Sequence, residues 1–206
     1  MIGTDATNIL FGVAILVMSV VIHEVSHGIA AYLQGDKTAA YAGRLTLNPI
    51  PHLDPVGSIL LPLILVIIGS PFMIGWARPV PYNPYNLRNQ KWGSAIVGAA
   101  GPLSNIFLAV VFGLVVRFGY GTLPLAFIAI STTIASINVV LAVFNLVPIP
   151  PLDGSKVLFS ALSYRWHRVQ ETLEQYGFII LIFFIMFLSP IIGIISEALF
   201  RLIVGA

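Results

Sequence analysis

The stretch Val21-Ile22-His23-Glu24-Val25-Ser26-His27-Gly28 decides the fold, because it places three ionisable side chains inside an apolar run. From Thr7 to Gln34 these are the only Asp, Glu, Lys, Arg or His residues, and no proline interrupts the run, so it predicts a helix. On that helix His23 and His27 share one face, where both imidazoles can reach one metal ion. Glu24 is turned by about 100° and can contact a metal-bound water without being a ligand.

The cost of burying these groups favours the metal. An ionisable side chain near the middle of a membrane helix costs roughly 2.5–3.5 kcal/mol on insertion scales, so three within five residues need a common explanation. A zinc site supplies one. The plainer alternative is a pair of packed histidines with a glutamate paired to an arginine, which the apolar surroundings disfavour.

The composition indicates an integral membrane protein. Of the 206 residues 58% are hydrophobic and 9% are charged, and the mean hydropathy is +0.97, whereas a soluble domain carries about 25% charged residues. The length suits a single membrane-embedded domain, residues 1–206. The net charge of +2 does not suggest nucleic-acid binding, and the absence of cysteine excludes disulfides and Cys-ligated zinc. The N-terminus lacks the features of a cleaved signal peptide, so we expect the first helix to be retained.

The apolar pattern predicts an all-α polytopic membrane protein built as a helical bundle. Its core is expected to consist of three helices, at about 8–34, 93–118 and 124–147. C-terminal helices are expected over about 174–204, with a break at Ser189-Pro190.

The region between the first two core helices, about 38–90, is irregular. Gly43–Leu47 alternates and predicts a short membrane-associated strand, and Ser58–Gly75 is apolar but interrupted by proline and glycine. If Ser58–Gly75 dips into the membrane and returns, eight of the ten Lys and Arg residues lie on one side; a full crossing divides them six to four. The positive-inside rule prefers the re-entrant path and makes the eight-charge side cytoplasmic.

Asp153 is the best candidate for a third metal ligand. A catalytic zinc takes three protein ligands and leaves one position open for water. Asp153 follows a proline-broken helix end, and the re-entrant path brings it to the same side of the membrane as His27, in the cytoplasmic half. The alternative is an ordinary N-cap for the segment that starts at Gly154.

These motifs resemble those of the site-2 protease family of intramembrane zinc metalloproteases. The resemblance rests on HEVSH at 23–27, on NLVPIPPLDG at 145–154, which has the pattern N-x-x-P-x-P-x-x-D-G, and on GPLSN at 101–105. The matching segments span the three core helices. The chain contains no inserted PDZ or CBS domain, so it resembles a minimal form of the family.

The resemblance implies roles for six residues. Three would hold one Zn²⁺ ion per chain, and one would be the general base of peptide hydrolysis. Two asparagines would lie near the substrate or the developing oxyanion, and for both of them helix–helix hydrogen bonding is the alternative. In that order the residues are His23, His27 and Asp153; Glu24; and Asn145 and Asn105.

The resemblance also implies the partners. The expected substrate is a transmembrane protein or peptide, cleaved within or next to its spanning segment in regulated intramembrane proteolysis, in the cell membrane of a prokaryote. A substrate helix must unwind before hydrolysis, and the strand expected at Gly43–Leu47 could pair with it. The lipid bilayer is the surrounding solvent, and no nucleic acid is expected.

Two further residues and two rival functions remain to be weighed. His52 and Asp54 are either a second polar pair or gate near the site or a turn at the membrane surface, and the flanking Pro51 and Pro55 favour the turn. A catalytically silent zinc-binding scaffold is disfavoured because a structural site does not need Glu24 as a base. A transporter is disfavoured because the charged groups cluster at one depth instead of forming a path.

Overall fold

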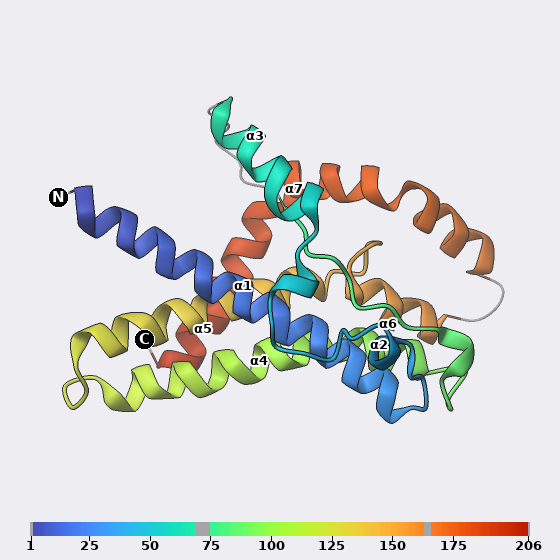
Figure 1. Cartoon of the computed structure of the whole chain (residues 1–206), viewed down its shortest axis with the longest axis horizontal. Helices are drawn as coiled ribbons and strands as arrows, with labels where there is room; N and C mark the ends of the chain where they lie inside the picture. Colours follow the sequence, from blue (N-terminus) through green and yellow to red (C-terminus); the bar gives the residue numbers. More distant parts are fainter. Residues whose placement is uncertain (1, 69–74, 163–165, 206) are drawn as a thin grey trace.

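The computed structural model describes residues 2–68, 75–162 and 166–205, and within them it is a helical bundle (Figure 1). Among the described residues, four helices are long and apolar enough to cross a membrane. They are α1 (Ile2–Leu33), α4 (Gly93–Gly119), α5 (Leu125–Asn145) and α7 (His167–Val204). The expected polytopic bundle is thereby confirmed, and its three core helices are α1, α4 and α5.

Helix α4 lies at the centre, where it packs against α1, α5, α7 and the short α6 (Asp153–Ala161). Its buried residues recur every three or four positions and most are small: Ala95, Gly98, Gly101, Asn105, Ala109 and Gly113. Helices in lipid gain little from the hydrophobic effect, so small residues stabilise the bundle by letting backbones approach closely. A Cβ at Gly113, for example, would collide with Ile203 of α7.

Between α1 and α4 the chain forms an excursion that returns to its starting point. It runs through α2 (Thr38–Tyr41), a 3₁₀ turn (Ile50–His52), a π-helix (Pro55–Leu60) and α3 (Leu61–Ile67), and comes back as an extended segment, residues 75–83, that a 3₁₀ turn (Pro84–Asn86) follows. In Figure 1 the teal α3 projects from the bundle.

Hydrogen bonds join the outgoing and the returning part of this excursion. The Trp76 N–H donates to the Gly57 carbonyl over 3.2 Å, and the Ser58 hydroxyl donates to the Trp76 carbonyl over 2.8 Å. Residues 69–74 of the apolar segment Ser58–Gly75 lie outside the described residues. The out-and-back path is the one that the charge count favours, and its depth in a membrane stays a prediction.

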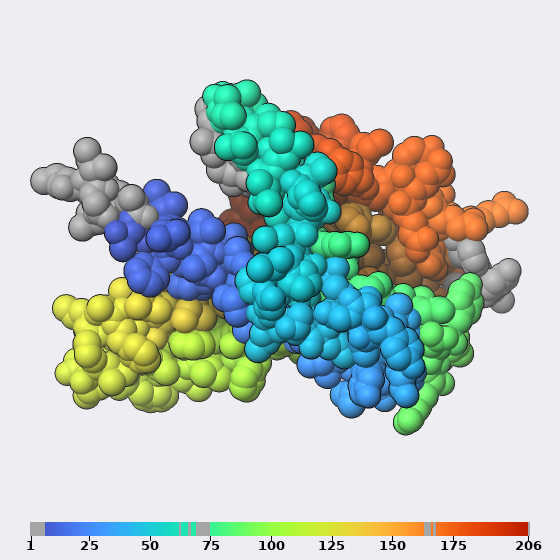
Figure 2. Space-filling view, in the orientation of Figure 1, coloured from blue at the N-terminus to red at the C-terminus, as the bar shows by residue number. Residues whose placement is uncertain are grey.

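The same region covers the middle of α1. A Cβ at Gly28 would lie 2.9 Å from a Val80 methyl group and would collide with the Leu45 side chain, so both segments lie against this helix face. Figure 2 shows the cyan residues of the excursion lying over blue α1. The face of α1 that carries Glu24 is therefore covered by the chain's own irregular segments.

The strand expected at Gly43–Leu47 does not form, and the described residues contain no strand. Gly43 adopts a left-handed conformation, with φ +64°, and the following residues make bends. The Asn48 N–H donates to the Thr46 hydroxyl and the Ile50 N–H to the Asn48 side chain. These local side-chain acceptors compete with strand pairing.

The break expected at Ser189-Pro190 also does not form, because α7 continues through Pro190 to Val204. Proline removes one backbone hydrogen bond and bends a helix without having to end it. Figure 1 shows α7 changing direction between its orange and red parts. One bent helix therefore replaces the C-terminal helices predicted from the sequence.

Candidate metal centre

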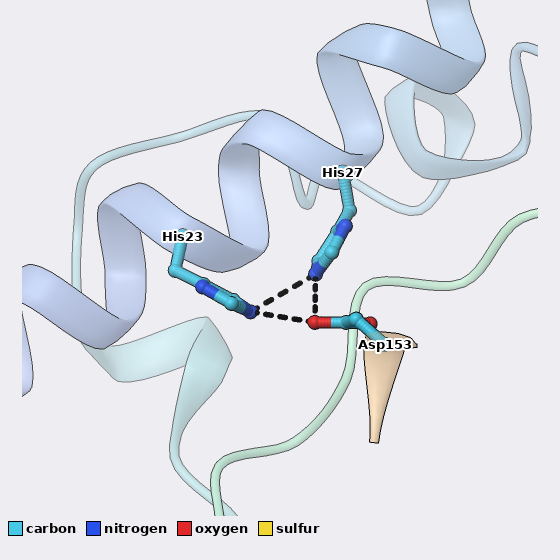
Figure 3. Close-up of side chains that lie close together, drawn as sticks. All are labelled: His23, His27 and Asp153. Atoms are coloured by element: carbon cyan, nitrogen blue, oxygen red, sulfur yellow. Dashed lines mark hydrogen bonds and ion pairs between the residues drawn. The ribbon is translucent and has the colours of Figure 1, made fainter. Parts of the chain in front are cut away.

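His23, His27 and Asp153 point toward one another at the junction of α1 and α6 (Figure 3). The two Nε2 atoms are 3.0 Å apart, and each lies 3.0 Å from Asp153 Oδ2. Each residue is only 6% exposed. The three side chains that the sequence selected as metal ligands thus form a compact, buried triangle of donor atoms.

Glycines let the start of α6 approach α4 and the end of α5. His23 and His27 lie one turn apart on α1, and Asp153 is the first residue of α6. A Cβ at Gly154 would collide with the Leu146 carbonyl oxygen, and one at Gly98 of α4 would lie 3.0 Å from the Asp153 carbonyl oxygen. The start of α6 therefore packs directly on the helix end before it and on α4.

The Asp153 carboxylate does not cap its helix. Leu152 occupies the N-cap position, while Asp153 Oδ1 accepts a hydrogen bond from Lys156 Nζ over 2.9 Å. Burial acts to lower the pKa of Lys156, but the Asp153 carboxylate outweighs it and raises this pKa, so the ammonium stays charged. Lys156 thereby occupies one carboxylate oxygen and leaves Oδ2 facing the histidines.

Hydrogen bonds on the far side of each imidazole place the ring protons. His27 Nδ1 lies 2.6 Å from the Val97 carbonyl oxygen, which can only accept, so Nδ1 carries the proton. His23 Nδ1 lies 2.5 Å from Asn105 Oδ1, which likewise accepts. In the neutral rings both Nε2 atoms therefore present bare lone pairs to Asp153 Oδ2.

This arrangement fits a metal ion. Three unprotonated acceptors at 3.0 Å repel one another unless a cation lies among them, and a single proton can link only two of the three. A Cβ at Gly101 would lie 2.5 Å from both Nε2 atoms, so this glycine leaves the space beside them open. Two imidazoles and one carboxylate are a donor set typical of catalytic zinc.

Glu24 lies beside the triangle and contacts the returning segment. Its Oε2 accepts a hydrogen bond from the Val80 N–H over 2.8 Å, and the residue is half-buried. Val80 itself is 6% exposed. The sequence did not predict this contact, because it joins the helix to an irregular segment 56 positions away.

The remaining predicted residues make other contacts. Asn145 Nδ2 donates to the Leu141 carbonyl within α5, and the His52 ring donates from Nε2 to the Thr46 carbonyl. Asp54 accepts from two backbone amides at the start of the π-helix. The hydrogen bonds of His52 and Asp54 are thus those of a turn and do not reach the triangle.

Two buried polar residues were missed by the sequence analysis. Asn138 and Ser19 are 0% and 3% exposed, and they continue the hydrogen-bonded chain that starts at His23 and Asn105. Their signal was available, because a polar side chain inside an apolar membrane helix indicates a function by default. The Val97 contact is made by a backbone carbonyl, which nothing in the sequence marks.

Proteins similar to this chain include named metalloproteases. The model of Peptidase family M50 matches residues 120–188. "Putative zinc metalloprotease YwhC" of Bacillus subtilis is 39% identical over 185 residues, which cover 85% of this chain and 79% of that protein. "Putative zinc metalloprotease Rip2" of Mycolicibacterium smegmatis is 31% identical over 184 residues, which cover 87% of this chain and 69% of that protein. No solved structure matches the chain.

Proposed function

Because the chain belongs to peptidase family M50, the family of the site-2 proteases, we propose that it is an intramembrane zinc metalloprotease with its centre at His23, His27 and Asp153. The observation that supports this most strongly is the triangle of three bare acceptor atoms, each 3.0 Å from the other two. One zinc ion per chain is the proposed occupant.

The residues around the centre divide the chemistry. A bound zinc ion polarises a peptide carbonyl and lowers the pKa of its water toward about 7. Glu24 accepts the proton of the attacking water on a carboxylate oxygen and donates it to the leaving amine nitrogen. Lys156 holds Asp153 Oδ2 toward the histidines. Asn145 is the proposed substrate contact, since Asn105 is already bonded to His23 and Asn138.

The proposed substrates are transmembrane proteins or peptides, cleaved within or next to a spanning segment. Supporting this, the centre lies on α1, which by length and composition can cross a membrane. The Val80 N–H bonds to Oε2 of Glu24 and leaves the other carboxylate oxygen free to accept a proton from water. Because the excursion that carries Val80 lies beside this base, it is the proposed side from which a substrate strand enters.

Glu24→Gln tests the chemistry. The variant should keep one zinc per chain by elemental analysis but lose cleavage of single-span proteins in proteoliposomes, because an amide cannot accept the proton of water. Glu197→Gln is the matched control, since Glu197 is exposed on α7 and pairs only locally, with Arg201 at 2.7 Å. It should cleave at the wild-type rate.

Cleavage by Glu24→Gln at the wild-type rate would refute the general-base role. If the wild type binds zinc and cleaves none of the single-span proteins tested in proteoliposomes, a catalytically silent zinc-binding scaffold is the better description.

We further propose that the centre lies in the cytoplasmic half of a prokaryotic cell membrane. The Asn83 N–H donates to Asp36 Oδ2 and the Arg88 N–H to the Gln34 carbonyl, so the excursion ends beside the end of α1. With eight of ten basic residues then on that side, the positive-inside rule makes it cytoplasmic.

Single-cysteine labelling tests this orientation on a chain without native cysteine. Probes at Lys37 and Tyr85 should react only from the cytoplasmic side, and a probe at Tyr120, in the turn between α4 and α5, only from outside. Labelling of Lys37 and Tyr85 from opposite sides would exclude the re-entrant path.

A further inference from the structure

We infer that Asn138 and Ser19 are positioning residues that act through Asn105 to keep the metal-facing nitrogen of His23 unprotonated. The inference rests on the proposed metal centre, and it concerns residues that do not touch the metal site themselves. It assigns a function to a buried polar chain that runs from α5 through α4 to α1.

Four side chains form this chain without interruption. His23 Nδ1 donates to Asn105 Oδ1 over 2.5 Å, Asn105 Nδ2 donates to Asn138 Oδ1 over 2.7 Å, and Asn138 Nδ2 donates to Ser19 Oγ over 2.9 Å. Both asparagines are fully buried, and Ser19 is 3% exposed. Water is therefore not available to replace a lost partner.

The direction of every bond follows from one backbone carbonyl. Asn138 Nδ2 also lies 2.9 Å from the Ile134 carbonyl oxygen, which can only accept. Asn138 must therefore turn its amide nitrogen toward Ile134 and its Oδ1 toward Asn105. Asn105 must then present Nδ2 to Asn138 and Oδ1 to His23, so the ring proton sits on Nδ1.

The opposite direction would block the metal. An amide side chain can rotate by half a turn and exchange its oxygen and nitrogen. If Asn105 did so, its Nδ2 would face His23, whose Nδ1 would then accept, and the ring proton would move to Nε2 among the ligand atoms. That rotation would also set Asn105 Oδ1 against Asn138 Oδ1, and a compensating rotation of Asn138 would set its Oδ1 against the Ile134 carbonyl.

The two histidines reach the same state by different means. His27 donates directly to the Val97 carbonyl, whose direction cannot change. His23 faces an amide instead, and the chain through Asn138 supplies the missing constraint. If the buried chain only held the helices together, its hydrogen bonds could run in either direction. Metal binding requires the direction in which His23 Nδ1 donates to Asn105 Oδ1.

Asn138→Leu removes the constraint and tests the inference. Zinc affinity, measured by competition with a chelator, should fall about 10- to 100-fold, the usual effect of losing an outer partner of a ligand histidine. In the metal-free protein, nitrogen NMR of labelled histidine should show, in part of the molecules, a neutral His23 with the proton on Nε2 and a bare Nδ1. The matched control is Thr132→Val on the same helix, which also loses a bond to a carbonyl four residues back and should change neither readout.

Asn138→Asp separates positioning from packing. A carboxyl group there still accepts from Asn105 and, when protonated, donates to the Ile134 carbonyl, so it should keep the His23 tautomer and most of the zinc affinity. If Asn138→Leu does not fold, Ser19→Ala provides a milder variant with a several-fold loss. The inference would be overturned if Asn138→Leu kept the wild-type His23 tautomer and zinc affinity. The same holds for Ser19→Ala if it has to replace Asn138→Leu. A wild type that binds no zinc would instead refute the proposed function, and the metal-free NMR would still decide on the tautomer.

Discussion

Two buried polar clusters lie near α1, one on the helix and one just past its end. They differ in whether the chain supplies a hydrogen-bond donor to every acceptor atom of the cluster. Asp36, just past the helix, is fully buried and accepts from the Asn83 N–H at 2.7 Å, the Asn86 side chain at 3.0 Å and the Thr38 hydroxyl at 2.6 Å. Every acceptor there faces a donor of the chain. That cluster stabilises the junction of α1 with the returning segment and needs no ligand.

The His23, His27 and Asp153 triangle is buried to a similar degree but is not complete. Its three facing atoms all accept, and the donors that the chain supplies lie behind them, at Lys156 and on the far ring nitrogens. Burial alone therefore does not distinguish a structural polar cluster from a metal site. The balance of donors against acceptors at the centre does.

The largest effect on this contrast is expected from Gly101→Ala. The added Cβ would lie 2.5 Å from both Nε2 atoms, so the imidazoles must move off the metal position. Zinc affinity should fall by at least about 100-fold, since displaced ligands cost no less than displaced outer partners. Elemental analysis of the purified protein and chelator competition measure it.

Gly12→Ala is the control for this substitution. Gly12 lies in α1, and a Cβ added there would meet nothing within 4 Å, so alanine should leave zinc binding unchanged and the helix slightly more stable. Wild-type zinc affinity in Gly101→Ala would show that the centre does not use the space beside this glycine.

Much of the candidate metal centre, but not the Asp36 cluster, could be predicted from the sequence. The period of the apolar run and the i, i+4 spacing placed His23 and His27 on one helix face, and charge counting brought Asp153 to them. Helical periodicity fixes which residues share a face but not which face meets which neighbour. The pairing of Asn138 with Asn105 and that of the Val97 carbonyl with His27 were therefore beyond reach, since they depend on how α4 packs against α5 and against α1.

The irregular region was predicted least well. Gly43–Leu47 alternates like a strand, but a strand needs a partner, and the local hydroxyl and amide acceptors of Thr46 and Asn48 bend the chain instead. The Val80 contact with Glu24 is set by the three-dimensional path of the excursion. Patterns of period two or 3.6 do not encode such a path.

A smaller effect is expected from Asp36→Asn, which tests the complete cluster. In the variant an amide N–H group would replace one carboxylate oxygen and point at N–H or O–H groups that now donate to that oxygen. The free energy of unfolding should therefore fall by about 1–3 kcal/mol. Zinc content per folded chain should stay at the wild-type value, because Asp36 bonds only within its own cluster. Thermal unfolding in detergent and elemental analysis measure the two quantities.

The pH dependence of the same variant gives an independent check. Burial acts to raise the pKa of Asp36, but the hydrogen bonds from Thr38, Asn86 and Asn83 outweigh it and hold the pKa below its ordinary value. A carboxyl with a lowered pKa stabilises the fold above its unfolded-state pKa, about 3.9, and loses that contribution as the pH falls toward the folded-state value. The wild type should therefore lose stability below about pH 4 more steeply than Asp36→Asn, whose amide does not titrate. Parallel curves for the two proteins would mean that the pKa of Asp36 is the same in the folded and unfolded states. A loss of zinc in the variant would mean that the two clusters are coupled.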